Sequence, residues 1–192
     1  MAKTLEKTAK SILGEEEGHF DLSVRHITKG KHHGSRLSPD IQTRLIKECL
    51  GKIADRRKLT VLSSSMSMGN RSENDVVCDL FKDIVKQFED FLERARARRT
   101  RKYPEKGMII CAQSPRENFL QSMMNQLRHH ETKCETLRNI VEVPAFMNPR
   151  SSVMVQVGSL LAYAVHQHVA NSSDELFDII SSKLFHEARH RT

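Results

Sequence analysis

The chain has 192 residues, which suits one domain with tails, and it contains no tryptophan, only 2 tyrosines and only 8 glycines. So few aromatic residues and glycines count against a strand-rich sandwich or barrel and favour helices. A formal net charge of +7 favours a polyanionic partner, with nucleic acid first and an anionic membrane or an acidic protein second.

The amino-terminal segment is basic and weakly patterned. Residues 2–13 carry apolar residues on one side of a short helix, but a polar run follows, so we expect residues 1–36 to form a partly disordered arm. Lys29, Lys31 and Arg36 give this arm a basic cluster. The opening MAKTLEKTAK lacks the apolar core of a signal peptide, so we expect a nuclear or cytoplasmic protein that is not secreted.

The remaining residues, 37–192, are expected to form a single helical-bundle domain. Ser38 followed by Pro39 predicts a helix start, because serine caps free N–H groups and proline fits the first helical position. The serine-rich stretch at about 63–71 has the composition of a flexible linker.

The longest helix signal runs from Ser72 to Tyr103. Apolar residues recur there at steps of three and four, and acidic residues come first and basic residues last, which complements the helix dipole. Ser114 and Pro115 predict the start of a second helix, over 115–143, with the same apolar stepping. Two such helices predict a long antiparallel hairpin.

The predicted fold class is therefore all-α, a helical bundle built on this hairpin with little or no strand. Two long apolar helical faces also predict self-association, with a symmetric homodimer as the simplest form. Between Ser151 and Ser173 there is no charged residue, which suggests a membrane span at first sight. The stretch is short for a span and Gln156 interrupts it, so we expect a buried central helix and no membrane partner.

An arginine-rich segment follows the apolar part of the long helix. A row of guanidinium groups on a helix end neutralises phosphates, and the segment has more basic residues than the helix dipole requires. Its residues are Arg94, Arg96, Arg98, Arg99, Arg101 and Lys102.

The leading hypothesis is a non-enzymatic, nucleic-acid-binding regulatory protein that self-associates through helical faces. The arginine-rich segment contacts phosphates, and Lys29, Lys31 and Arg36 add a clamp. RNA is favoured over DNA because the sequence has no recognisable helix-turn-helix pattern. The alternative is a helical adaptor for protein partners, in which the arginines act in nuclear import or bind an acidic protein.

We expect no cofactor and no metal site, although two groups have the spacing of zinc ligands. HEARH at 186–190 places His186 and His190 one helical turn apart, as in zinc hydrolases, which makes a hydrolase a lesser alternative. The pattern arises easily by chance, and a chain terminus is a poor support for a catalytic cleft. His130 and Cys134 are also four residues apart. They lie on the apolar face of the predicted helix over 115–143, so a packing role fits them better than a metal site.

Overall fold

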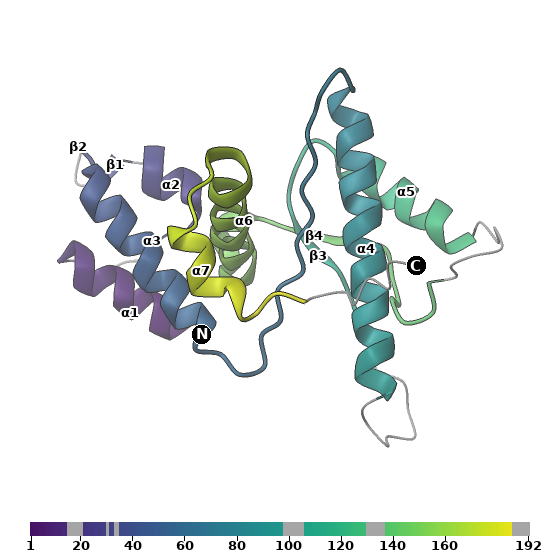
Figure 1. Ribbon diagram of the computed structural model, residues 1–192, viewed down its shortest axis with the longest axis horizontal. Coiled ribbons are helices and arrows are strands. Elements are labelled where there is room, and N and C mark those ends of the chain that lie inside the picture. The colour runs from purple at the N-terminus through teal and green to yellow at the C-terminus, as the bar shows by residue number, and fades with distance from the viewer. Residues whose placement is uncertain (15–20, 30, 33–34, 98–105, 130–136, 186–192) are drawn as a thin grey trace. The chain divides into compact units, whose positions relative to one another are not determined.

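A computed structural model of residues 1–192 describes the chain apart from six segments (Figure 1). Those segments are 15–20, 30, 33–34, 98–105, 130–136 and 186–192. The described residues are mostly helical, which confirms the predicted helical class, and they also form two small two-stranded sheets.

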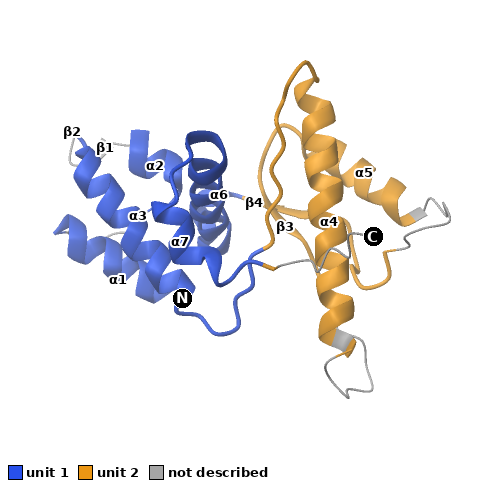
Figure 2. Ribbon diagram, in the orientation of Figure 1, with its two compact units in different colours: residues 1–61, 148–184 blue, residues 62–147, 185–192 orange. Residues whose placement is uncertain are grey.

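The chain divides into two compact units (Figure 2). Unit 1 comprises Met1–Val61 and Asn148–Leu184, and unit 2 comprises Leu62–Met147 and Phe185–Thr192. Leu5 and Ala9 of the amino-terminal segment are fully buried in the core of unit 1.

Unit 1 is a helical core whose described residues also form a short hairpin. Its elements are α1 (Ala2–Leu13), α2 (Val24–Lys29), β1 (Lys31–His32), β2 (Ser35–Arg36), α3 (Pro39–Ala54), the 3₁₀ helix η1 (Pro149–Ser151), α6 (Val153–Asn171) and α7 (Glu175–Ser181). The start of α3 is as predicted: Pro39 is its first residue, and the side chain of Ser38 accepts a hydrogen bond from the Ile41 N–H. Leu45, Cys49 and Ile53 follow at intervals of four and are fully buried, so one face of α3 forms the core.

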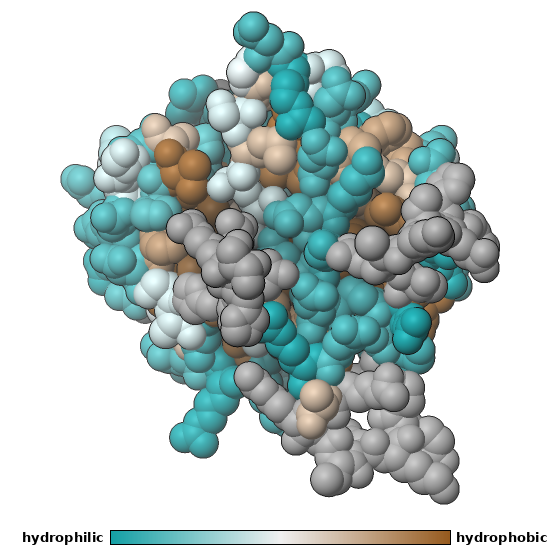
Figure 3. Space-filling model, turned by 45° about the vertical axis from the view of Figure 1, so that its right-hand side comes forward, coloured by the Kyte–Doolittle hydropathy of each residue, from teal (hydrophilic) through white to brown (hydrophobic). Residues whose placement is uncertain are grey.

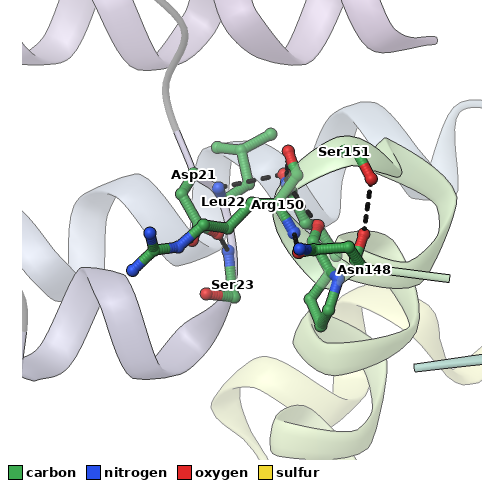
Figure 4. Close-up of polar contacts among 8 residues, drawn as sticks. Asp21, Leu22, Ser23, Asn148, Arg150 and Ser151 are labelled. Carbon is green, nitrogen blue, oxygen red and sulfur yellow. Dashed lines mark hydrogen bonds and ion pairs between the residues drawn. The ribbon is translucent and has the colours of Figure 1, made fainter. Parts of the chain in front are cut away.

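A buried glutamine joins distant segments of unit 1. Gln156 of α6 is fully buried; its Oε1 accepts a hydrogen bond from the Leu22 N–H (3.0 Å), and its Nε2 donates to the Pro149 carbonyl (2.8 Å). Figure 4 shows Leu22 facing the Asn148–Ser151 turn across this contact. A buried amide with both ends satisfied favours one arrangement of these segments over others. No helix among the described residues is both long and apolar enough to cross a membrane.

Unit 2 packs two helices against a parallel strand pair. Its elements are α4 (Glu73–Ala97), β3 (Ile110–Ala112), α5 (Glu117–His129) and β4 (Ala145–Met147). Ser72 caps α4, since its Oγ accepts a hydrogen bond from the Asp75 N–H (3.2 Å). The buried core cluster consists of Val85, Leu92, Met124 and Ile140.

The long antiparallel hairpin is not confirmed. α4 is close to its predicted extent as far as Ala97, but α5 ends at His129, and residues 137–147 contain no helix. Instead, β4 runs parallel to β3 with Ile110 paired to Ala145. The β-branched residues at 140, 141 and 143, followed by Pro144, explain this difference, because they favour an extended chain despite their helical spacing.

Candidate nucleic-acid interface

The arginine-rich segment begins on a well-supported part of α4. Val85 and Leu92 are 1% and 5% exposed, so the carboxyl-terminal half of α4 is anchored in the core of unit 2. Since α4 is helical without a break up to Ala97, this support extends to the first arginines of the segment.

Arg94 is held by an aromatic pair. Its guanidinium carbon lies 4.9 Å from the ring centroid of Phe185, and that ring meets Phe91 edge to face at 5.6 Å between centroids. When a guanidinium stacks on an aromatic ring, the flat face of the guanidinium contacts the ring. The N–H groups in the guanidinium plane stay available to an anion. Arg94 is therefore fixed in a way that permits phosphate binding.

The rest of the segment is described only in part. Arg96 lies in the last turn of α4, directly before Ala97. Four predicted contact residues lie outside the described residues, namely Arg98, Arg99, Arg101 and Lys102.

The second predicted basic cluster lies in unit 1, around the β1–β2 hairpin. Lys29 is the last residue of α2 and is exposed. Lys31 and Arg36 are directly opposite each other in the antiparallel pairing of β1 with β2, and Arg36 is exposed. The hairpin therefore places Lys31 opposite Arg36, five positions further along the sequence.

A buried carboxylate, which the sequence analysis missed, fixes α4 to the segment before β4. Glu89 is 7% exposed, and its Oε1 accepts hydrogen bonds from the backbone N–H groups of Arg138 (2.9 Å) and Asn139 (2.8 Å) and from Asn139 Nδ2 (2.7 Å). Its Oε2 accepts from the Ile140 N–H (3.2 Å). Three successive backbone N–H groups therefore converge on one carboxylate, which replaces the hydration lost on burial.

The sequence does contain a signal for this contact. Glu89 lies four residues after Val85 and three before Leu92, so it shares the buried face of α4 with both. An acidic residue at such a position requires buried donors, although the sequence does not identify Asn139 as one of them.

Two of the described thiols are unreactive because they are buried. Burial raises the pKa of the Cys49 thiol to about 12, with a smaller contribution from Glu48, and burial also raises the pKa of Cys111. Both thiols are therefore poor nucleophiles at neutral pH. Within the described ranges no three His, Cys, Asp or Glu side chains are grouped as metal ligands. The predicted candidates His130, Cys134, His186 and His190 lie outside those ranges.

Comparison of the chain with protein-family models, curated proteins and solved structures finds no match.

Proposed function

We propose that this protein is a non-enzymatic nucleic-acid-binding protein whose arginine-rich segment, Arg94 to Lys102, contacts the phosphate backbone. The observation that carries the proposal is the continuity of α4 to Ala97. A helix anchored by buried residues leads directly into the densest run of basic residues in the chain.

The chemistry favours backbone contact over base reading. Guanidinium groups bind phosphate oxygens through paired N–H donors, and their contribution does not depend on base identity. Within the arginine-rich segment there is no aromatic residue on which bases can stack. RNA remains the favoured ligand, as a polyanion recognised by shape and backbone.

The stacking of Arg94 on Phe185 adds to this proposal. Ordering a long side chain on binding costs about 0.5–1.5 kcal/mol for each side chain that becomes immobile. Because the Phe185 ring already restrains the Arg94 guanidinium, part of that cost is met in the free protein. Arg94 is thus expected to contribute more affinity than a basic residue that moves freely.

A charge-reversal experiment tests the proposal. The double variant Arg98→Glu/Arg99→Glu is expected to bind labelled single-stranded RNA at least about ten-fold more weakly in fluorescence anisotropy, since each reversal replaces a phosphate contact with repulsion. The matched control is Arg57→Glu/Lys58→Glu, which makes the same charge change at two exposed residues outside the segment.

The control is expected to retain most of the affinity. Equal losses in both double variants indicate that only net charge matters, and the proposed segment is then wrong. Absence of RNA binding by the unmodified protein at low salt rejects the proposal itself.

A further inference from the structure

The outer edge of β3 has no strand partner in the part of the chain that the structure describes. In the pairing with β4, the Ile109 carbonyl accepts from the Ala145 N–H and the Gln113 N–H donates to the Met147 carbonyl; before this pairing, the Gly107 N–H donates to the Asn139 carbonyl. Backbone groups alternate in direction along a strand, so those of Met108, Ile110 and Ala112 point away from β4. Among the described residues β3 pairs with β4 alone.

The outer edge of β4 is blocked at its start. Its outward residues by the same alternation are Pro144 and Phe146. Pro144 has no N–H, and its carbonyl accepts a hydrogen bond from Nε2 of Gln121 on α5 (3.2 Å). A proline on the outer side is a common block against further strand pairing, and β3 has no such block.

The side chains along the open edge are apolar and uncovered. Met108 is 56% exposed and Ile110 is 47% exposed, while the alternate residue Ile109 packs against the core of unit 2. Parallel strands are normally covered on both faces. Figure 3 shows a mainly hydrophilic face with several apolar patches between the polar residues.

The segment 107–113 contains no charged residue and no proline. Natural proteins use charges, prolines and bulges to keep exposed strand edges from pairing. Residues 107–113 contain neither a charge nor a proline. An unprotected apolar edge next to an uncovered face is the arrangement that accepts an added strand.

We infer that the occupant is β3 of a second copy, which pairs antiparallel about a two-fold axis at Ile110 to give a four-stranded sheet. In this register Ile110 faces the same residue of the other copy, and Met108 faces Ala112. Each such pair exchanges two N–H···O bonds through the backbone groups that point outward. The interface is isologous, so it closes as a dimer and does not propagate.

The lack of charge on residues 107–113 fits a second copy in this register. Two chains of net charge +7 repel each other, so they meet most easily through a segment without charge. The nearest charged residue on the amino-terminal side is the exposed Lys106, and the antiparallel register sets it opposite Ser114 of the other copy. Glu117 of that copy lies close by, because its Oε1 accepts a hydrogen bond from the Ser114 N–H (3.2 Å). Each end of the pairing then brings Lys106 of one copy, whose Nζ also donates to the Arg138 carbonyl of its own copy (2.6 Å), near Arg116 and Glu117 of the other copy. This dimer does not depend on nucleic-acid binding.

Sedimentation over a range of protein concentrations tests the inference. The sedimentation coefficient is expected to rise with concentration towards that of a dimer, whereas Ile110→Lys stays at the monomer value throughout. Val169→Lys is the matched control, because Val169 is also an exposed apolar residue, at 55%, but lies on α6; it is expected to dimerise like the unmodified chain. A monomer at every concentration, or an Ile110→Lys variant that dimerises normally, overturns the inference.

Oxidative cross-linking tests the register in variants that keep the native fold. Ile110→Cys is expected to give a covalent dimer on a non-reducing gel, since the two introduced thiols face each other across the axis. Ala112→Cys is the control in the same strand, because in this register the two Ala112 residues lie four residue positions apart along the strands. Adding Met108→Cys to it is expected to restore the cross-link. Equal cross-linking of Ile110→Cys and Ala112→Cys, or none in any variant, contradicts the proposed pairing.

Discussion

The substitution Glu89→Gln tests whether the buried carboxylate holds unit 2 together. It keeps the shape of the side chain but removes its charge and replaces one acceptor oxygen with an NH₂ donor. The three backbone N–H groups that converge on Glu89 then have one acceptor atom instead of two. At least one buried N–H group therefore loses its partner.

The magnitude follows from these contacts. A hydrogen bond to a charged group contributes about 1.5–3 kcal/mol and a neutral one about 0.5–1.5 kcal/mol, so weakening two retained bonds costs about 2 kcal/mol. A buried donor left without a partner costs a further 1–3 kcal/mol or so. We therefore expect Glu89→Gln to lower the free energy of unfolding by about 4 kcal/mol, a large share of the stability of a typical domain.

Urea unfolding followed by circular dichroism is the suitable assay, since the chain contains no tryptophan for fluorescence. The matched control is Glu93→Gln, an exposed residue one turn further along α4, which is expected to change stability by less than about 0.5 kcal/mol. If Glu89→Gln is as mild as this control, the reasoning about the buried carboxylate is wrong. The effect of Asn139→Ala is expected to be less than additive with it, because both remove the same contact.

Three further predictions concern other parts of the chain. Gly107→Ala is expected to lower the free energy of unfolding by about 1–3 kcal/mol in the same urea assay, because a Cβ there would lie 2.5 Å from Cζ of Phe88. Phe185→Ala is expected to weaken RNA binding about two- to five-fold in fluorescence anisotropy, since it removes the ring beneath Arg94. Cys49 is expected to react with Ellman's reagent only when the protein unfolds: a pKa raised from 9.0 to about 12 lowers its thiolate fraction at pH 8 about a thousand-fold. Rapid reaction of every thiol in the folded protein contradicts that burial.

The helices whose limits are set by local chemistry could be predicted from the sequence. Ser38 with Pro39, and Ser72 with its acidic first turn, fix the starts of α3 and α4 through contacts within a few residues. The regular apolar spacing of α4 predicted a seam through Phe88 and Phe91, but these are only partly buried, and the buried residues Val85 and Leu92 flank that seam.

The parallel strand pair could not be predicted in the same way, because its partners are more than thirty residues apart in the sequence. Leu137 and Val141 continue the helical spacing of α5, yet both lie in a segment without helix. That segment is held by Glu89 and by pairing with residues 107–113, and neither contact has a local pattern. Tertiary contacts outweigh helical spacing here.

The candidate interface could also be predicted from the sequence only in part. Its charged residues are visible in the sequence, but the Phe185 ring beneath Arg94 and the pairing of Lys31 with Arg36 depend on the fold. Sequence reasoning can therefore name the basic residues, while their supports come from packing between segments distant in the chain.

The most direct test of the proposed function is the salt dependence of RNA binding by the unmodified chain. Each neutralised phosphate contributes about −0.7 to the slope of log K against log salt concentration for a single strand, so six basic residues predict a slope of about −4. The variant Arg98→Glu/Arg99→Glu is expected to show a slope of about −3 or shallower. A slope near zero for the unmodified chain, or an identical slope for the variant, contradicts phosphate binding by the arginine-rich segment.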